Sequence, residues 1–296
     1  MAGQEALIGY NVPDIAQLND SYGDGIGHAE LVISRDLSRR PHSAAKIVVF
    51  ANEKGGVGKS TLAFHCCAAL CNAGYRIAAI DLDSRQRTLT RALENREGTA
   101  RRLKVKLPQP HYSTLVHQTG AALVQEIARI GSNADFIILD VAGHDSSIGR
   151  HAIAMADTMI TPVNSSFVDI DLLGQFDSLT MELKRFGSFA RLVQELREVR
   201  DYRSKPPVDW VVVQNRLRRS GSANEVRVGE ALTMLSTKAG FRLARSLGER
   251  VAYRELFLLG LTVFDLKHIP EFARAQPIAK SEIAQLISEL RLTTVA

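Results

Sequence analysis

The chain has few cysteines, no long hydrophobic run and no basic-then-apolar leader at its start. Its three cysteines all lie within residues 66–71, so they form neither a dispersed disulfide framework nor a metal-finger pattern. The longest apolar run without a charged side chain, residues 62–75, is shorter than the roughly 20 residues of a membrane span. Glu5 and Asp14 occupy the region where a signal peptide is basic and then apolar. We therefore expect a reduced, cytoplasmic protein with no integral membrane association.

The overall composition is that of an ordinary globular protein. Of its 296 residues, 45% are hydrophobic and 23% are charged, which allows a sizeable core and argues against a largely disordered chain. Residues 1–44 differ, because they contain five glycines and scattered acids without a sustained hydrophobic period. We predict a flexible N-terminal arm there, with a segment that orders on a partner as the alternative. Residues 45–296 are expected to form a single domain.

From residue 46 onward, short apolar runs alternate with helix-length stretches. The runs interpreted as strands are Lys46–Ala51, Arg76–Leu82, Asp135–Asp140, Thr158–Thr161 and Asp209–Asn215. The helix-length stretches include Ser60–Ala73, Ile148–Ala156, Leu172–Phe186 and Asn224–Ala239. This alternation predicts an α/β fold with a doubly wound, mostly parallel sheet and helices on both faces. Ligands of such folds bind at the carboxyl ends of the strands.

The most specific motif follows the first of these strands. It reads Asn-Glu-Lys-Gly-Gly-Val-Gly-Lys-Ser-Thr over residues 52–61 and leads into a predicted helix, which is the context of a phosphate-binding loop. Its glycines allow backbone N–H groups to approach phosphate oxygens, and the helix N-terminus adds a positive end. The spacing differs from that of a dinucleotide-binding fingerprint, so we predict a P-loop NTPase-type fold.

The residues of this loop have separate expected roles. Lys59 is predicted to reach the β- and γ-phosphates of ATP, and the Ser60 hydroxyl is predicted to ligate Mg²⁺. The other residues assigned to nucleotide binding are Lys54, Gly55, Gly56, Val57, Gly58 and Thr61. ATP and Mg²⁺ are therefore the predicted substrate and metal.

Acidic residues end two of the predicted strands. Asp81 and Asp83 follow the second strand, and Asp140 ends the third. A hydrophobic strand that ends in Asp is the Walker B arrangement, which holds Mg²⁺, commonly through water. We predict that Asp81 and Asp140 support the metal beside Ser60, with Asp140 also counted as catalytic. Each acid alone would be interpreted as a strand-end cap or ion-pair partner, so the assignment depends on the phosphate loop.

The loop departs from the standard phosphate loop, because Glu53 replaces its first glycine and Lys54 precedes the others. This form resembles the deviant loop of the ParA/MinD family of ATPases. The early lysine of that family reaches the ATP of a second subunit, so the resemblance implies that Lys54 acts across an ATP-bound homodimer. It also implies that Asp83 orients the attacking water and that Asn215 and Arg216 contact the adenine.

Further blocks resemble the MipZ branch of this family, over about three quarters of the chain. These blocks are Ile80–Thr88, Glu94–Arg96, Ser165–Gly174, Asp209–Val213, Asn215–Leu217, Tyr253–Phe257 and Gly260–Thr262. The resemblance implies a switch that positions the bacterial division plane. Its monomers would be recruited by the ParB–centromere complex near the poles, and its dimers would bind nonspecific DNA of the nucleoid and block FtsZ polymerisation.

Two departures from this pattern are visible. Residues 1–44 have no counterpart in the compact family pattern, and residues 141–144 read Val-Ala-Gly-His where the group usually has Thr-Pro after the Asp. Because the second departure lies in the expected switch region, it bears on the rate of ATP hydrolysis, which we expect to be slow, rather than on nucleotide binding.

Basic residues are concentrated between residues 184 and 254. This segment contains 16 Lys and Arg against 7 Asp and Glu, a local net charge of +9 in a chain whose total is +5. The clusters within it are Arg197, Arg200, Arg203 and Lys205 before one predicted strand, and Arg216, Arg218 and Arg219 after it. Such a basic face binds DNA phosphates without sequence preference and weakens steeply with salt. We therefore predict nonspecific DNA binding through residues 184–254.

Three other functions fit parts of the sequence. A ParA-type ATPase for chromosome or plasmid partitioning shares the loop but not the narrower blocks at 165–174 and 253–257. A metabolic ligase that resembles dethiobiotin synthetase also uses a deviant loop, although the basic C-terminal half favours a polymeric partner. A nucleotide-gated scaffold that barely hydrolyses ATP remains open because of residues 141–144.

Overall fold

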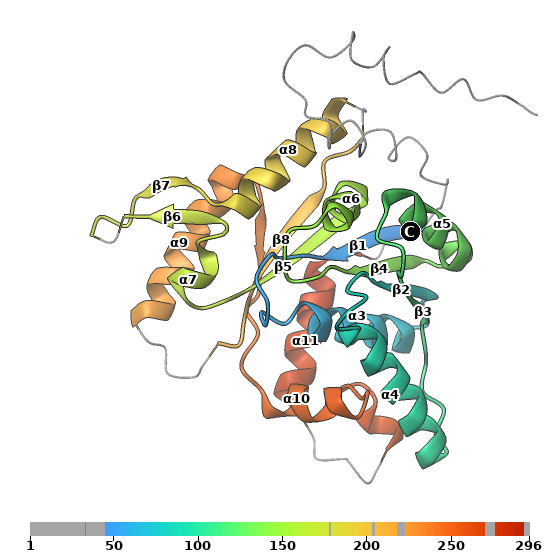
Figure 1. Ribbon diagram of the computed structural model, residues 1–296. Helices are drawn as coiled ribbons and strands as arrows, with labels where there is room; N and C mark the ends of the chain where they lie inside the picture. Colours follow the sequence, from blue (N-terminus) through green and yellow to red (C-terminus); the bar gives the residue numbers. More distant parts are fainter. Residues whose placement is uncertain are drawn as a thin grey trace, which may run out of the picture.

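The computed structural model describes Ile33 and residues 45–177, 179–202, 205–217, 223–269 and 276–292. Over these residues the chain forms a seven-stranded sheet, a separate two-stranded hairpin and surrounding helices (Figure 1). The predicted N-terminal arm, residues 1–44, lies outside the described residues except for Ile33, which is buried in the hydrophobic core. The single domain expected over residues 45–296 stays a prediction.

The seven strands of the main sheet run parallel in the order β3-β2-β4-β1-β5-β8-β9. Their bounds are β1 (Lys46–Phe50), β2 (Ile77–Asp81), β3 (His111–Thr114), β4 (Phe136–Asp140), β5 (Thr158–Asn164), β8 (Asp209–Asn215) and β9 (Arg242–Ala244). The hairpin consists of β6 (Gly174–Phe176) and β7 (Leu183–Phe186). The helices are α3 (Lys59–Asn72), α4 (Thr88–Leu103), α5 (Gly120–Gly131), α6 (Ser147–Met155), α7 (Phe167–Ile170), α8 (Ser188–Tyr202), α9 (Ala223–Ala239), α10 (Val251–Leu258), the 3₁₀ helix η1 (Leu266–His268) and α11 (Pro277–Glu289).

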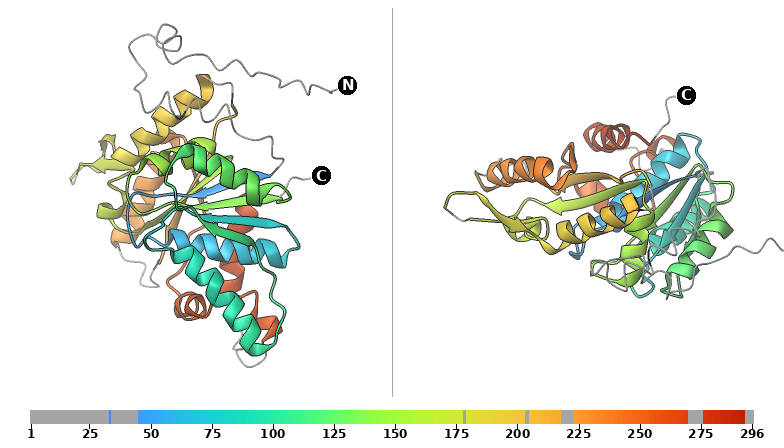
Figure 2. Two further views of the ribbon diagram at one scale, coloured as in Figure 1. Left: turned by 45° about the vertical axis from the view of Figure 1, so that its right-hand side comes forward. Right: turned by 90° about the horizontal axis from the view of Figure 1, so that it is seen from above.

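Successive residues of the central strand β1 face opposite sides of the sheet. Ile47 and Val49 belong to the hydrophobic cluster on one face, and Val48 and Phe50 belong to the cluster on the other, as strand geometry requires. Helices α5, α6, α8 and α9 contribute to the first cluster, and α3, α4, α10 and α11 contribute to the second. Seen from two further directions, the sheet lies between these helical layers (Figure 2). The predicted doubly wound fold is confirmed.

The register of the sheet aligns the carboxyl ends of three strands. Phe50, the last residue of β1, pairs with Asp140, the last residue of β4, and Asp140 pairs with Asp81, the last residue of β2. Because the strands are parallel, the loops that follow them leave the sheet at the same edge. That edge carries the phosphate loop together with both acids that the sequence assigns to the metal.

One predicted helix, over residues 172–186, is wrong. The segment forms the β6–β7 hairpin at one side of the molecule (Figure 1). An added Cβ on Gly174 would lie 2.6 Å from the Leu235 side chain, so the hairpin packs closely against α9. At the turn, the Asp177 carboxylate accepts two backbone N–H groups and pairs with Lys184 at 2.8 Å. These turn contacts favour a hairpin over the helix that the apolar spacing indicated.

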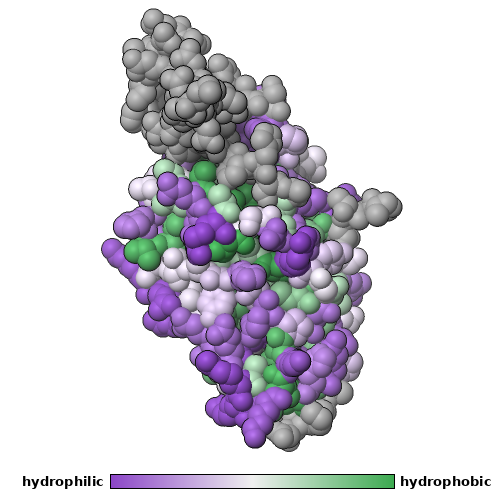
Figure 3. All heavy atoms as spheres, turned by 90° about the vertical axis from the view of Figure 1, so that its right-hand side faces the viewer, coloured by the Kyte–Doolittle hydropathy of each residue, from purple (hydrophilic) through white to green (hydrophobic). Residues whose placement is uncertain are grey.

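The surface beside α4 and α5 is mostly hydrophilic, with apolar residues scattered between polar ones (Figure 3). No helix in the described part of the chain combines the length and the apolar character needed to cross a membrane.

Candidate functional site

The phosphate loop joins β1 to α3 and has the backbone geometry of an anion-binding turn. Gly56 and Gly58 have φ angles of +76° and +99°, which side chains with a Cβ rarely adopt. Gly58 is also the N-cap of α3, and no side chain caps this helix. The first N–H groups of α3 are therefore open to an anionic ligand, as at other phosphate-binding helix ends. Ser60 and Thr61 lie in the first turn of this helix.

Two buried asparagines tie the phosphate loop to the neighbouring strands β5 and β8. The Asn52 side chain donates to the carbonyl of Pro162 in β5 at 2.8 Å and accepts the N–H of Lys54 at 2.9 Å. The Asn215 side chain, at the end of β8, donates to the carbonyl of Val57 at 2.8 Å. Both asparagines are almost fully buried, so these bonds fix the loop in a low-dielectric environment. The bracing role of Asn52 has no signal in the local sequence, because its partner is distant in the chain.

The Lys59 side chain folds back from the start of α3 across the phosphate loop. A lysine that contacts the phosphates of a nucleotide bound in this loop is expected to lie there. The Lys59 ammonium donates to the carbonyl of Lys54 at 2.9 Å, and the residue is 7% exposed. Burial lowers the pKa of Lys59, while the carboxylates of Asp140 and Asp83 act in the opposite direction. A buried cation surrounded by acids and by open helix N–H groups fits a polyphosphate.

Asp81 and Asp140 differ in how their oxygens are used. Asp81 accepts backbone N–H groups from Asp83 and Thr90, each at 3.0 Å. Asp140 is 1% exposed, and its Oδ1 has no hydrogen-bond partner. Burial raises the pKa of Asp140 to about 8, the Asp81 carboxylate adds to this shift, and a hydrogen bond from Ser60 opposes it. A buried carboxylate oxygen without a partner, next to a hydroxyl, is a suitable environment for a hydrated Mg²⁺.

Asp83 begins the loop between β2 and α4. Its Oδ1 accepts the backbone N–H groups of Arg85 and Gln86 at 3.2 and 2.9 Å, which closes a local side-chain turn. The backbone N–H of Asp83 is bonded to Asp81. The side chain is thus anchored near Lys59, on whose pKa its charge acts, and its role in orienting water stays a prediction.

The loop after β4 passes close to the phosphate loop. An added Cβ on Gly143 would lie 3.0 Å from the Cα of Gly55 and 3.2 Å from the ammonium of Lys59. The N–H of Val141 donates to the carbonyl of Phe50 at 3.0 Å. Gly143, in the segment that differs from the usual Thr-Pro, therefore lies directly beside the phosphate loop, and a Cβ there would crowd the Gly55 backbone and the Lys59 ammonium.

Lys54 points away from its own loop. Its ammonium lies 2.7 Å from Oδ1 of Asp169 and donates to the carbonyl of Val168 at 3.1 Å, both in α7. The lysine side chain is 32% exposed and that of Asp169 is 12% exposed. The sequence motif identified Lys54 as special but did not indicate Asp169 as its partner.

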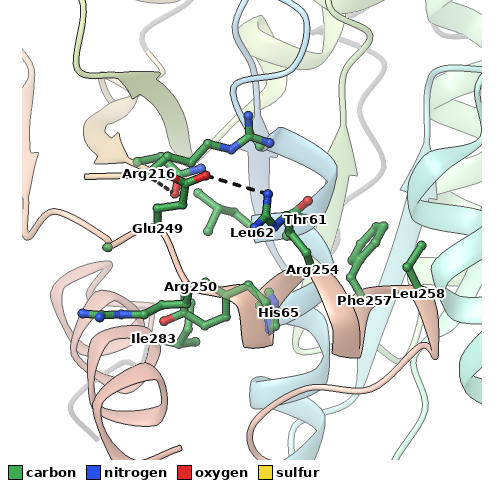
Figure 4. Close-up of a pocket in the computed structure, with 14 residues that line it drawn as sticks. Thr61, Leu62, His65, Arg216, Glu249, Arg250, Arg254, Phe257, Leu258 and Ile283 are labelled. Carbon is green, nitrogen blue, oxygen red and sulfur yellow. Dashed lines mark hydrogen bonds and ion pairs between the residues drawn. The ribbon is translucent and has the colours of Figure 1, made fainter. Parts of the chain in front are cut away.

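A cavity of about 410 Å³ opens beside the first turn of α3 (Figure 4). Asn215, Arg216, Gly58 and Thr61 are among the residues that line it. The other lining residues are Leu62, His65, Gly248, Glu249, Arg250, Tyr253, Arg254, Phe257, Leu258 and Ile283. The predicted adenine contacts, Asn215 and Arg216, are thus brought to the phosphate loop, although the Asn215 amide group is already bonded to Val57 and to the N–H of Arg216.

Two arginines of the predicted basic clusters are used inside the fold. Arg200 is 4% exposed and donates to the carbonyl of Ala154 at 2.6 Å. Arg197 donates to the carbonyl of Ala239 at 2.8 Å, and its guanidinium lies 5.4 Å from the centre of the Trp210 ring. The expected contribution of Arg200 to a DNA-binding face is therefore wrong, because it is buried, whereas Arg197 is half-buried and its N–H groups bond to the carbonyls of Ala239 and Gly240.

The remaining cations of residues 184–254 fall into three groups. Arg242 and Arg250 are half-buried and pair with Asp209 and Glu282. Arg203, Arg218 and Arg219 lie outside the described residues. The exposed cations among the described residues are Lys184, Arg185, Arg191, Lys205, Arg216, Arg227, Lys238, Arg245 and Arg254.

The described residues contain no group of three or more His, Cys, Asp or Glu side chains that could hold a metal ion. Mg²⁺ in nucleotide sites usually binds through the phosphates and one or two protein oxygens. Ser60 and the unpartnered oxygen of Asp140 are suitable for that role, with Asp81 behind them.

Comparison with known families agrees with this geometry. The family model described as ATPase MipZ matches residues 46–294. The chain belongs to the MipZ ATPase family. Protein VirC1 of Rhizobium radiobacter is 29% identical over 126 residues, which cover 43% of this chain and 52% of VirC1. The chromosome partitioning protein ParA of Myxococcus xanthus is 25% identical over 217 residues, which cover 58% of this chain and 77% of ParA. The chain thus matches about half the length of VirC1.

Solved structures share the fold of this MipZ-family chain. The complex of McdA with ATP from Cyanothece has a TM-score of 0.60 at 16% identity and covers 86% of this chain and 99% of McdA. MinD of Aquifex aeolicus has a TM-score of 0.53 at 17% identity, with 85% and 99% covered. MinD with Mg-ADP from Pyrococcus horikoshii has a TM-score of 0.52 at 15% identity, with 83% and 96% covered. These similarities confirm the predicted P-loop ATPase fold.

Proposed function

We propose that this protein is an ATP-dependent dimerising switch that positions the division site by regulating FtsZ assembly. The observation that carries the proposal is the placement of Lys54, the extra lysine that precedes the glycines of the phosphate loop. Lys54 is partly exposed and directed away from its own loop, whereas Lys59 is buried across that loop. A loop that keeps one lysine for its own nucleotide leaves the other available to a second subunit. Membership of the MipZ ATPase family supports the same mechanism.

In this mechanism the loop binds the phosphates of ATP through its backbone N–H groups and the Lys59 ammonium. Ser60 and Asp140 would hold the magnesium, with Asp81 as support, and the metal would supply neutralisation of phosphate charge during hydrolysis. Asp83 orients the attacking water, and the partner subunit contributes its own copy of Lys54 to the charge that develops on the γ-phosphate.

Loss of the γ-phosphate removes the contact between the subunits. The affinity of the two subunits for each other therefore differs between the ATP and ADP states, which is what a ligand-driven switch requires. We expect slow hydrolysis, because Val141 and Ala142 follow Asp140 where the family usually has a Thr hydroxyl and a proline. Slow turnover keeps the ATP-bound dimer populated long enough to act.

The partners that we propose are FtsZ, ParB and nonspecific DNA. Support comes from the MipZ family match and from the local net charge of +9 over residues 184–254. Exposed Arg185 and Arg191, on β7 and α8, are candidates for DNA phosphate contacts. A dimer would present two such faces, which strengthens weak contacts by avidity. The corresponding location is the bacterial cytoplasm, on the nucleoid and near the poles.

The dimerisation test uses light scattering after size exclusion, with ADP and with a nonhydrolysable ATP analogue. The mass should double only with the analogue. Asp83→Ala should also stay dimeric with ATP itself, because it binds ATP without hydrolysing it. A protein that stays monomeric with every nucleotide would overturn the switch.

The partner test uses sedimentation of FtsZ polymers and salt-dependent DNA binding. FtsZ polymer should decrease when the ATP-bound dimer is added and not when the ADP form is added. Arg185→Glu with Arg191→Glu should weaken DNA binding, whereas Lys106→Glu, an exposed change outside the basic segment, should not. FtsZ polymerisation that is indifferent to the dimer would favour the ParA-type partitioning function instead.

A further inference from the structure

The cavity beside α3 extends past the part that the nucleotide is expected to use. Its volume of about 410 Å³ lies in the range of small-molecule sites, roughly 300–1,000 Å³. Gly58 and Thr61 line it where α3 begins, and Asn215 is bonded to the phosphate loop beside them. His65 lines it further along the same helix. Because an α-helix rises about 1.5 Å per residue, His65 lies about 10 Å along the axis from Gly58.

The distal part of the cavity is mostly apolar. It is lined by Leu62 and His65 of α3, Phe257 and Leu258 of α10, and Ile283 of α11. Leu62 and Ile283 are buried, whereas Leu258 is 73% exposed, so this part reaches the surface at the end of α10. Figure 4 shows Phe257 and Leu258 on the side away from Arg216. The predicted base contacts therefore do not account for the distal part.

Packed rings form a wall of the distal part. The ring centre of His65 lies 5.2 Å from that of Tyr253. The ring centres of Phe64 and Phe257 are 5.4 Å apart, and both pairs meet edge to face. The Tyr253 hydroxyl donates to the carbonyl of Ala279 at 2.9 Å, which ties α10 to α11. Because these contacts fix the side chains, the distal part is a preformed site rather than a gap that closes by repacking.

Arginines give the cavity an excess of positive charge. Its lining includes three arginines and one acid, Glu249. Arg250 is paired with Glu282 of α11. Arg254 lies 3.9 Å from Glu249, which is too long for a hydrogen bond, and its side chain is 66% exposed. The Arg254 guanidinium can therefore donate charge-assisted hydrogen bonds to an added carboxylate.

We propose that the distal part binds a medium-chain aliphatic carboxylate while ATP occupies the phosphate loop. The carboxylate binds the Arg254 guanidinium, and the hydrocarbon chain packs against Leu62, Phe257 and Leu258. Burial of apolar surface provides most of the affinity, and the ion pair selects an acid over an alcohol of the same length. The site takes a ligand other than the nucleotide, so it does not depend on the proposed dimer.

Calorimetric titration of the full chain with octanoate, at saturating ATP and Mg²⁺, tests this site. The wild type should bind one octanoate, and octanol should bind several-fold more weakly because it lacks the charge. Leu258→Asp should weaken octanoate binding about tenfold or more, since a second negative charge then lies beside the hydrocarbon chain. Val251→Asp, which changes another exposed apolar residue of α10 that does not line the cavity, should match the wild type.

Arg254→Gln separates the ion pair from the apolar contact. It should weaken octanoate binding several-fold and leave octanol binding unchanged, whereas Glu255→Gln, an exposed change on the same helix, should alter neither. The ring-proton NMR signals of His65, assigned with His65→Asn, should shift on saturation with octanoate because the ring lines the site.

No saturable binding in the wild type overturns the inference, as do unchanged His65 signals or equal weakening by Leu258→Asp and Val251→Asp. Octanoate that ATP displaces would mean that the cavity serves the nucleotide alone, which also overturns it. A wild type that binds octanoate but no ATP would overturn the proposed function and leave the carboxylate site standing.

Discussion

Asp81 and Asp140 are cross-strand partners at the carboxyl ends of β2 and β4, yet only one of them has a free oxygen. Both carboxylate oxygens of Asp81 accept backbone N–H groups, whereas the buried Oδ1 of Asp140 has no hydrogen-bond partner. An unpaired buried carboxylate costs folding free energy unless a ligand compensates. The pair therefore divides into a structural acid and a ligand-binding acid.

Asp140→Asn should weaken binding of ATP in the presence of Mg²⁺ by about tenfold or more, because one oxygen that orients the hydrated metal is lost. Without Mg²⁺ the variant and the wild type should bind ATP equally. Titration of a fluorescent ATP analogue with and without a chelator measures both. Asp145→Asn, which removes a surface carboxylate of the same loop, is the control. Equal losses with and without the metal would mean that Asp140 contacts the nucleotide by another route.

Asn215→Ala should lower the affinity for every nucleoside triphosphate by a similar factor. Its side chain braces the Val57 carbonyl, so its loss loosens the loop that binds the phosphates. If Asn215 instead contacts the adenine, ATP should lose affinity while GTP and CTP stay nearly unchanged. Competition titrations with the three nucleotides distinguish these outcomes.

Arg96→Met should cost about 3–5 kcal/mol of unfolding free energy, since it leaves a buried carboxylate unpaired. Arg96 and Asp265 are both fully buried and joined by two hydrogen bonds of 2.6 and 2.7 Å, which tie α4 to the segment before η1. Chemical denaturation provides the measurement, and Arg96→Met with Asp265→Leu should recover part of the loss. The exposed pair Arg129–Glu126 is the comparison, because Arg129→Met should cost less than about 1 kcal/mol.

Mild acid should destabilise the fold through His65. Burial lowers the pKa of His65 from 6.5 to about 4, and neither ring nitrogen has a partner. The unfolded imidazole takes up a proton near pH 6.5 while the folded one stays neutral. The unfolding free energy should therefore fall between pH 6.5 and pH 4, by up to about 3 kcal/mol. Denaturant unfolding of the wild type and His65→Asn at pH 7, 5.5 and 4.5 tests this, and parallel losses in both would contradict it.

The sequence predicted the strands and the phosphate loop because both depend on local patterns. Asp140 and Lys59 were found from motif spacing alone, and the sheet register then brought them together. Leu172–Phe186 was mistaken for a helix, since the contact of Gly174 with α9 and the Asp177 turn cannot be seen in apolar spacing.

Contacts between distant segments were beyond local patterns. Arg197 and Arg200 were counted as surface charge, although carbonyls from other elements bind them. Asn52 and Asp169 were identified only as parts of motifs, and their contacts were not predicted, because their partners in β5 and in the phosphate loop lie more than a hundred positions away. What the sequence missed is therefore the set of long-range contacts that hold the site.

Mixing two inactive variants tests the shared active site most directly. Lys54→Ala gives no lysine to a partner but keeps Asp83, and Asp83→Ala donates Lys54 but lacks its own water-orienting acid. Each alone should hydrolyse ATP at near-background rates. An equal mixture should recover about a quarter of wild-type turnover, because half of randomly formed dimers are mixed and each of those holds one complete site. Turnover of the mixture that stays at the mean of the two variants would show that Lys54 does not act between subunits.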